Sequence, residues 1–369
     1  MRNGQEKNNG FIKICAMGLR GIPEIQGGVE KHCQSLYPRL NGVEVTLFRR
    51  KPYINHSADH TYKGIKYIDL PSTRIKGFEA LFHTMLCAVQ AVCRRPDVVH
   101  VHNIGPGLFI PFMKLFGLRV VMTYHSANYE HAKWGKMAKR LLRFAEKMSL
   151  RYADKVIFVN RDKYEIYDAV IGDRAVYIPN GVERIELTAD DSRIRRFGLE
   201  RGKYILAVGR ITPEKGFDCL VRGANMTGSD EKVVIVGGSD HDERYLQELK
   251  ALDVKGRVCF TGSLSGEDLR QIYSNARLFV LSSINEGFPL VMLEAMNYRL
   301  PIIATDISAT RIPQINDNDK FAPGDAEALS RALETHKAVK GPIYYDISEY
   351  DWSRIAAVTE VIFRNVSKP

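Results

Sequence analysis

Two carboxylates, Glu286 and Glu294, flank a Gly-Phe-Pro turn and the apolar start of a helix in the segment EGFPLVMLE. The preceding residues, 276–283, are apolar and β-favouring, which predicts a buried strand. Pro289 suits the first helical position, because it has no N–H to leave unpaired and its φ is already helical. The N–H groups of the first turn would be those of Leu290, Val291 and Met292. Such N–H groups form a binding site for anions.

Acceptor side chains beside an anion-binding helix end suit a phosphorylated sugar. The sugar hydroxyls would donate to Glu286 and Glu294, while the phosphates would accept from the backbone. The simpler alternative is a carboxylate that caps the helix, together with a solvated surface glutamate. These nine residues alone leave both interpretations open.

A second segment, KYILAVGRITPEKG (203–216), places two cations after another apolar strand. Gly209 and Gly216 permit a close turn, and Arg210 and Lys215 would lie at the carboxyl end of the strand. Ligands collect at that edge of open α/β sheets, and a guanidinium with an ammonium can offset the charges of a diphosphate. A solvated loop with incidental charge explains this segment alone equally well. Together with the glutamate pair, a diphosphate site is favoured.

The two motifs, Gly-Arg-x-x-x-x-Lys-Gly (209–216) and Glu-Gly-Phe-Pro-x-x-x-x-Glu (286–294), resemble the nucleotide-sugar site of the family 4 retaining glycosyltransferases. The resemblance implies an α/β chain with two facing Rossmann-like domains, the GT-B architecture, with mainly parallel sheets and helices on both faces. It also implies roles for individual residues. Arg210, Lys215 and the amides of Leu290 and Val291 would stabilise the departing diphosphate. Glu286, with Gly287 and Phe288 beside it, would hold the donor sugar, and Glu294 would hold the ribose.

The first strand-like segment, 11–18, leads into a loop that also suits a ligand. The loop is not GxGxxG, so a dinucleotide fingerprint is not supported. Gly27 and Gly28 directly precede a helix, where bare amides can approach an anion or sugar, and Arg20 adds a cation. The family has a Gly-Gly loop here, which the resemblance places at the donor. A tight strand-to-helix turn is the structural alternative.

His125 closes the strand RVVMTYH, where the family keeps a histidine near the donor sugar. The resemblance makes His125 a catalytic candidate, although a lone histidine is more often structural. His100 and His102 share one face of another strand, but no third metal ligand is visible in the sequence. The aspartates at 190–191 and 317–319 do not follow apolar strands, so we expect metal-independent chemistry.

Two further positions match the family. Asn180, in PNGV, falls at the entry to the second domain, and Leu264 falls in a loop that contacts the nucleotide base in the family, so the resemblance implies that both contact the donor. Turn residues also occur at such places for structural reasons. The stretch 125–128, together with 133–136, differs from the commonest family pattern and resembles a branch engaged in bacterial polysaccharide assembly.

Strand and helix signals alternate along the chain, which indicates parallel sheets with crossover helices. We expect a first, acceptor-side domain over 1–182 and a donor-side domain over 183–349. A closing helix over 350–369 is expected to pack back on the first domain. The length of 369 residues is ample for two cores.

Composition indicates a soluble enzyme in a reducing compartment. Six cysteines are scattered without metal or disulfide spacing, and no signal peptide or membrane-spanning segment is visible. We therefore expect a cytoplasmic protein, either free or peripheral on the inner face of the cell membrane.

Positive charge is concentrated in the first half. Residues 1–180 hold 28 lysines and arginines against 15 acidic residues, and the excess peaks over 133–155. One stripe of this expected helix is basic: Lys136, Lys139, Arg140, Arg143, Lys147 and Arg151. A second stripe is apolar: Trp134, Met137, Leu141, Leu142, Ala145 and Met148. Such a helix can lie on an anionic membrane, or it can be a core helix with a solvated basic face. No motif accompanies the charge that would indicate nucleic acid binding.

The expected reaction moves a hexosyl group, with retention, from a nucleoside-diphosphate sugar to a saccharide or lipid-linked acceptor in bacterial surface polysaccharide synthesis. UDP is favoured, the nucleotide sugar is a co-substrate, and no cofactor is expected. One alternative is a nucleotide-sugar epimerase or hydrolase on the same scaffold. Another is a non-catalytic partner subunit.

Overall fold

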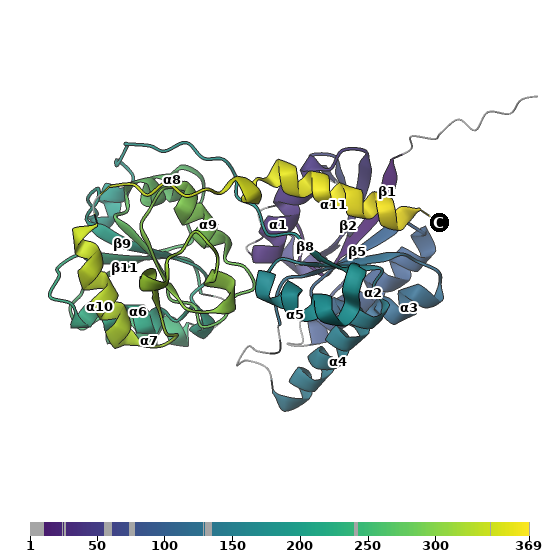
Figure 1. The fold of residues 1–369 in the computed structure, drawn as a ribbon, viewed down its shortest axis with the longest axis horizontal. Helices are drawn as coiled ribbons and strands as arrows, with labels where there is room; N and C mark the ends of the chain where they lie inside the picture. Colours follow the sequence, from purple (N-terminus) through teal and green to yellow (C-terminus); the bar gives the residue numbers. More distant parts are fainter. Residues whose placement is uncertain are drawn as a thin grey trace, which may run out of the picture. The chain divides into compact units, whose positions relative to one another are not determined.

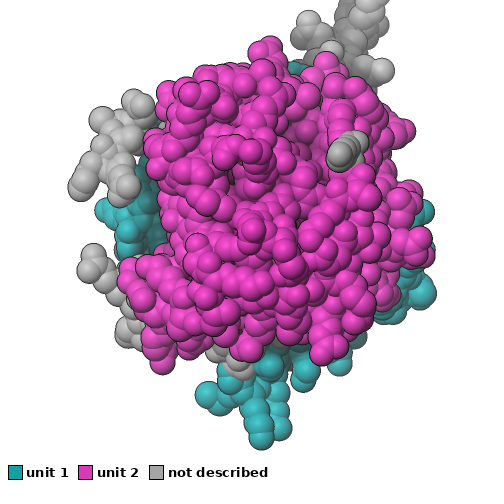
Figure 2. Space-filling model, turned by 90° about the vertical axis from the view of Figure 1, so that its left-hand side faces the viewer, with its two compact units in different colours: residues 1–181, 352–369 teal, residues 182–351 magenta. Residues whose placement is uncertain are grey.

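The computed structural model describes residues 11–368 except 24, 26, 55–60, 74–77, 128, 130–134, 240–242 and 340. Strands and helices alternate along the described chain (Figure 1). The chain divides into two compact units, coloured separately in Figure 2. Unit 1 contains residues 1–181 and 352–369, and unit 2 contains residues 182–351. These divisions fall at 181/182 and 351/352, against the expected 182/183 and 349/350.

Unit 1 is built on an eight-stranded sheet in the order β3-β4-β2-β1-β5-β6-β7-β8. Neighbouring strands are parallel except β3 and β4, which are antiparallel. The strands are β1 (Ile12–Met17), β2 (Val43–Arg50), β3 (Thr61–Tyr62), β4 (Ile65–Leu70), β5 (Val98–His102), β6 (Val120–Tyr124), β7 (Lys155–Phe158) and β8 (Ala175–Tyr177). The helices are α1 (Gly28–Leu36), α2 (Phe78–Arg94), α3 (Ile110–Leu115), α4 (Lys136–Tyr152), α5 (Arg161–Ile171) and α11 (Trp352–Ser367).

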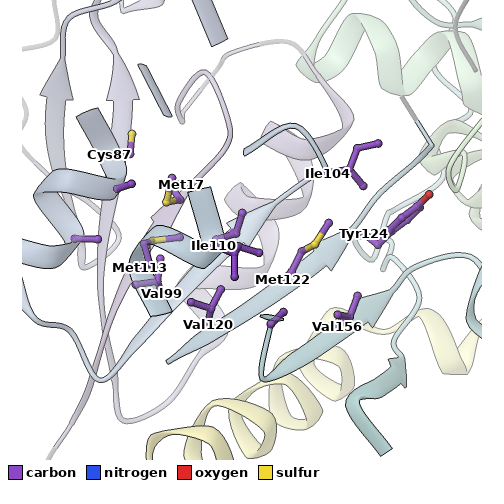
Figure 3. Packing of buried hydrophobic residues seen from close by; sticks show 14 of the residues in the cluster. Met17, Cys87, Val99, Ile104, Ile110, Met113, Val120, Met122, Tyr124 and Val156 are labelled. Carbon is purple, nitrogen blue, oxygen red and sulfur yellow. The ribbon is translucent and has the colours of Figure 1, made fainter. Parts of the chain in front are cut away.

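Both faces of this sheet are covered, which explains why apolar residues of its strands enter a core on either side. Alternate residues of β1 enter different cores: Cys15 and Met17 pack on one face, Ile14 and Ala16 on the other. The first core includes residues of α2, α3, α4 and α5, and Figure 3 shows part of its packing around Met122. The second core is closed by α1 and by α11, which contributes Trp352 and Phe363 among others.

Unit 2 contains a six-stranded parallel sheet in the order β11-β10-β9-β12-β13-β14. Its strands are β9 (Tyr204–Val208), β10 (Lys232–Val236), β11 (Val258–Gly262), β12 (Leu278–Leu281), β13 (Ile302–Thr305) and β14 (Lys320–Phe321). Its helices are α6 (Phe217–Met226), α7 (Arg244–Leu252), α8 (Gly266–Asn275), α9 (Leu290–Asn297) and α10 (Ala326–Thr335). Residues of α6, α7 and α10 share a core with one face of the sheet, and Tyr273 of α8 stacks on Phe279 of β12 on the other. The two sheets confirm the α/β fold class, with a Rossmann-like arrangement in each unit.

The structure departs from the expected elements in a few places. The short strands β3 and β14 were not expected, because two residues show no periodicity. The last strand of unit 1, β8, ends at Tyr177, and Ile178 to Gly181 after it are irregular. All six cysteines are free, and four of them are buried. Within the described residues, no helix is both long and apolar enough to cross a membrane.

Candidate functional site

The two motifs of unit 2 follow neighbouring strands. Because β9 and β12 pair in parallel, their carboxyl ends meet at the same edge of the sheet. The loop after β9 and the loop after β12 are joined there by two hydrogen bonds. Ser282 Oγ donates to the Lys215 carbonyl over 2.9 Å, and the Ile284 amide donates to the Glu214 carbonyl over 2.9 Å. The sheet topology thus joins two segments that are far apart in the sequence.

Gly216 makes this close approach possible. Its φ of +60° lies in the left-handed region, and a Cβ at this position would lie 2.1 Å from the Ser282 carbonyl oxygen. Both the backbone conformation and the lack of space therefore require glycine. Gly216, the second glycine of the motif, therefore allows the two loops to approach each other closely.

Lys215 and Glu286 form an ion pair across the joined loops. Lys215 Nζ lies 2.5 Å from Glu286 Oε1, and both side chains are largely buried. Ser283 Oγ donates to the same carboxylate oxygen over 2.7 Å. The sequence predicts that Lys215 and Glu286 bind different groups of the ligand, and the structure shows that they also contact each other.

Arg210 and Glu294 lie on the same two segments but have different surroundings. Arg210 Nη2 lies 3.9 Å from Glu214 Oε1, within its own loop. Glu294, on α9, accepts a hydrogen bond from Tyr273 Oη over 3.1 Å. The Tyr273 ring is fully buried and stacks on Tyr298 with the ring centroids 4.8 Å apart. This packing fixes the hydroxyl that orients the Glu294 carboxylate.

The start of α9 differs from the expectation by one residue. Pro289 is the N-cap and not the first helical residue, and the helix begins at Leu290. The Met292 amide donates to the Pro289 carbonyl over 3.0 Å, so the expectation that it is free was wrong. Leu290 and Val291 remain in the first turn, where amides have no partner within the helix. Phe288 is buried, with its ring centroid 5.7 Å from that of Tyr350, so its side chain anchors the turn that also contains Gly287.

Leu264 lies at the same edge of the sheet. The carboxyl ends of β9, β10 and β11 are linked by hydrogen bonds from Ile211 N to Gly238 O and from Gly237 N to Gly262 O, each 2.9 Å long. Leu264 follows two residues later and is half-buried. The loops of unit 2 that contain predicted donor-site residues therefore lie at one edge of its sheet.

In unit 1, the glycine loop precedes α1 as expected. Gly27 is the N-cap of α1, and a Cβ there would lie 2.0 Å from Glu30 Oε2, which is a structural reason for glycine. Gly28 has no atom within 4 Å of its Cβ position, so this residue borders open space. Glu30 Oε1 accepts from the Arg20 amide over 3.0 Å, and the Arg20 guanidinium lies 5.0 Å from the Tyr53 ring centroid.

His125 belongs to a buried cluster of histidines. His125 Nε2 and His102 Nδ1 are 3.0 Å apart, and the His32 ring lies edge-on to His125 with the centroids 4.9 Å apart. His32 Nδ1 lies 2.8 Å from Asn180 Oδ1, an acceptor, so this nitrogen carries the proton. Asn180 was expected to contact the donor, but its side chain is buried in unit 1, where it orients His32.

Burial keeps these histidines neutral. It lowers the pKa of His32 to about 4 and that of His100 to about 3, and it holds the pKa values of His102 and His125 well below the usual range. One nitrogen from each of His32, His102 and His125 lies within 4.8 Å of the others, close enough for a metal site in which these atoms are the ligands. In the structure, however, two of the rings are hydrogen-bonded to each other. His100, which shares a strand face with His102, does not belong to this group, because it contacts Tyr37 and Thr123.

Several residues that hold the candidate site together were not predicted from the sequence. His32, Tyr37 and Tyr273 come from helices that approach the strand ends only in the folded chain. Ser283 is the second residue after β12 and resembles any small loop residue. His32, which follows the Gly-Gly pair on α1, and Ser283, three residues before Glu286, lie near motifs that could have drawn attention to them.

Comparison with known proteins identifies both halves of the chain. The model of Glycosyltransferase Family 4 matches residues 26–184, and the model of Glycosyl transferases group 1 matches residues 190–340. The alpha-maltose-1-phosphate synthase of Mycolicibacterium smegmatis is 26% identical, over 96% of this chain and 100% of the relative.

Solved structures show the same fold. The sucrose-phosphate synthase of Thermosynechococcus elongatus superposes with a TM-score of 0.79 at 22% identity, covering 96% of this chain and 99% of that one. HepE of Anabaena in complex with UDP-glucose gives a TM-score of 0.69 at 17% identity, covering 97% and 96% of the two chains. The expected family and fold are confirmed: the chain belongs to the group 1, family 4-type glycosyltransferases and is a hexosyltransferase with two Rossmann-like domains.

Proposed function

We propose that the enzyme transfers a hexosyl group from a nucleoside-diphosphate sugar to a saccharide or lipid-linked acceptor, with retention of the anomeric configuration. One observation carries this proposal: unit 2 joins the Arg210–Lys215 loop to the Glu286–Leu290 loop at the carboxyl edge of its sheet. Cations, carboxylates and the start of α9 then serve one ligand that is both anionic and rich in hydroxyls.

In this proposal the cations stabilise charge on the departing diphosphate. An ammonium has three N–H donors, so Lys215 can keep its bond to Glu286 and still donate to phosphate oxygens. Arg210 and the amides of Leu290 and Val291 add donors where negative charge develops. Glu286 accepts from the sugar hydroxyls, and Glu294, oriented by Tyr273, accepts from the ribose.

Retention follows from attack on the same face of the sugar that the diphosphate leaves. The acceptor oxygen bonds to the anomeric carbon as the bond from that carbon to the phosphate oxygen breaks. The leaving phosphate takes the acceptor proton, so no covalent enzyme intermediate is required. Arg210 and Lys215 supply the cationic charge, and we therefore propose a metal-independent reaction whose rate EDTA leaves unchanged.

UDP is the favoured nucleotide, supported by the fold shared with HepE, whose structure contains UDP-glucose. A thermal-shift panel of UDP, GDP and dTDP sugars tests this choice, because ligands that bind the native state raise its stability. NMR of the product then reports the stereochemistry, and an inverted linkage would refute retention. An assay without acceptor separates transfer from epimerase or hydrolase activity, in which the donor is consumed alone.

We also propose that α4 rests on an anionic membrane surface, where a lipid-linked acceptor for bacterial surface polysaccharide would be available. The apolar stripe, for which the sequence left a membrane role and a core role open, is partly solvent-exposed, and so is Phe144 beside it. Met137, Leu141 and Phe144 are 84%, 45% and 52% exposed. They lie at positions i, i+4 and i+7, so they share one face of the helix. Trp134, also expected in this stripe, lies outside the described residues.

The charges of α4 complement anionic lipid. Its six lysines and arginines carry the positive charge, and its single acidic residue, Glu146, is buried. Glu146 accepts hydrogen bonds from Tyr124, Tyr129 and Tyr167, which fix the rotation of the helix and so keep the apolar stripe exposed. Each basic residue near the surface adds about 1 kcal/mol to binding.

Co-sedimentation with phosphatidylglycerol-containing and pure phosphatidylcholine vesicles tests this proposal. We expect salt-sensitive binding to the anionic vesicles only, which Leu141→Ser combined with Phe144→Ser abolishes. Ile166→Ser combined with Val170→Ser is the matched control, since these residues of α5 are also exposed and four apart. Equal binding by both double variants, or binding to nucleic acid in place of vesicles, would contradict the membrane role.

A further inference from the structure

An uninterrupted chain of hydrogen bonds runs through the core of unit 1 and ends at His125. Thr123 Oγ1 lies 2.7 Å from His100 Nε2, and His100 Nδ1 lies 2.9 Å from Tyr37 Oη. Tyr37 Oη lies 2.6 Å from His102 Nε2, and His102 Nδ1 lies 3.0 Å from His125 Nε2. All five residues are buried. We call this chain the histidine relay.

The protons along the histidine relay depend on each other. A neutral imidazole has one N–H and one lone pair, so a ring that accepts at one nitrogen must donate from the other. The phenol of Tyr37 has a single proton to donate. The position of the proton on one group therefore determines its position on the next. The hydrogen bond that Tyr37 donates to His102 thus determines which nitrogen of His125 is protonated.

The distances indicate the direction. An N–H donor usually lies about 2.9–3.0 Å from its acceptor, whereas an O–H donor approaches to about 2.7–2.8 Å. The short contacts of Thr123 and Tyr37 suit hydroxyl donors, and the longer contact from His100 Nδ1 suits an N–H donor to Tyr37 Oη. His102 Nε2 then accepts from Tyr37, and its Nδ1–H donates to His125 Nε2. Cys33 Sγ, a weak donor, lies 3.4 Å from the same His102 Nε2, which agrees with an acceptor there.

We propose that Tyr37, acting through His102, holds His125 in the tautomer that carries its proton on Nδ1. This inference rests on the proposed function, in which His125 contacts the sugar or the leaving phosphate. It makes His125 a neutral hydrogen-bond donor toward a ligand oxygen and excludes it as a general base through Nε2, which is already engaged. Tyr37 and His102 are positioning residues. They do not touch the substrate.

NMR of side-chain nitrogens in protein labelled with ¹⁵N-histidine tests the tautomer directly, because protonated and unprotonated imidazole nitrogens resonate at different frequencies. We expect His125 to be protonated on Nδ1 in the wild-type protein. In Tyr37→Phe, His102 loses its hydroxyl donor, and we expect the proton of His125 to move to Nε2. Tyr204→Phe is the control, since it removes a buried hydroxyl that donates to the Ile272 carbonyl in unit 2.

Kinetics provide a second readout. We expect kcat of Tyr37→Phe to fall ~10-fold or more while the donor KM changes little, since the loss of a group that orients a functional histidine typically costs 10–100-fold. His102→Asn retains an N–H donor near the position of Nδ1 and should keep more activity than His102→Leu. This pair also provides the test if Tyr37→Phe does not fold.

Three results would overturn the proposal: His125 protonated on Nε2 in the wild-type protein, an unchanged tautomer in Tyr37→Phe, or one tightly bound metal ion per chain. A metal on His102 and His125 would displace the proton between them. The NMR measurement requires no activity. If no nucleotide sugar supports transfer, the proposed function fails, while the tautomer of His125 is still determined.

Discussion

Lys215 Nζ contacts Glu286 Oε1 at 2.5 Å although 71 residues separate them in the sequence. The two charged groups neutralise each other, so neither of these largely buried side chains carries an uncompensated charge. A diphosphate that binds there adds negative charge near Lys215, and the sugar hydroxyls give Glu286 new donors. The ion pair therefore connects the phosphate and sugar parts of the proposed donor.

Lys215→Ala should lower kcat by ~10²–10³, because the loss of one preorganised donor to developing charge costs about that much. The measurement is steady-state transfer, with circular dichroism to confirm folding. Lys203→Ala is the control, since Lys203 also pairs with a glutamate, Glu200, at 2.5 Å but precedes β9 and is exposed. Wild-type turnover of Lys215→Ala would refute its role at the phosphate.

Gly216→Ala should destabilise unit 2 more than Gly256→Ala does. The two glycines have nearly equal φ values, +60° and +62°, so both substitutions incur the cost of the left-handed region, about 1–2 kcal/mol. Only at Gly216 would the new Cβ meet a carbonyl oxygen, whereas Gly256 borders open space. Urea unfolding measures the difference, and equal losses would show that the loops separate without cost.

Acid should destabilise unit 1. Burial lowers the pKa of His32 and of His83 to about 4 from the ordinary 6.5. Between these values the unfolded chain binds protons that the folded chain excludes, so the free energy of unfolding falls as the pH drops from 6.5 toward 4. The slope is about 1 kcal/mol per pH unit for each such histidine.

Urea unfolding at pH 7, 6 and 5 measures this slope. His83→Gln keeps a donor for the Arg49 carbonyl, which His83 Nε2 contacts at 3.2 Å, and removes one titrating group. We expect a shallower slope in this variant. A free energy of unfolding that does not change between pH 7 and pH 5 in the wild-type protein would contradict the neutral, buried state of these histidines.

Trp352→Ala should destabilise unit 1 by about 3–5 kcal/mol, the usual cost of removing a large buried aromatic side chain. The Trp352 ring packs beside Gly181 and edge-on to His32, with the ring centroids of the latter pair 5.4 Å apart. Thermal unfolding measures the loss. Val361→Ala, at an exposed position on the same helix, is the control and should change stability little.

The sequence predicted what depends on local pattern. Apolar runs located the long strands, and the order of strands and helices indicated the two sheets. The motifs around Lys215 and Glu286 contain the residues of the proposed donor site, and their neighbouring positions followed from strand ends in a parallel sheet. Their direct contact could not be predicted, because it depends on which strands are adjacent, and β12 follows β11 in the sequence but pairs with β9.

The histidine relay was less accessible to prediction for the same reason. His100 and His102 are two residues apart on one strand, so the sequence showed that their side chains share a face. Tyr37 lies in a short 3₁₀ helix after α1, and nothing in its local sequence indicates that it reaches the end of β5. The exposed stripe of α4 was also ambiguous, because periodicity shows that a face is apolar but does not show whether anything covers it.

The return of α11 to unit 1 has a consequence for how the chain is made. Ribosomes complete residues 182–351 before they add Trp352 and Phe363, which the core of unit 1 contains. Unit 2 is continuous and can fold as soon as it emerges, whereas unit 1 begins first and must wait with part of its core open. A stop codon after residue 351 would therefore spare unit 2 and damage unit 1, the half that was synthesised earlier.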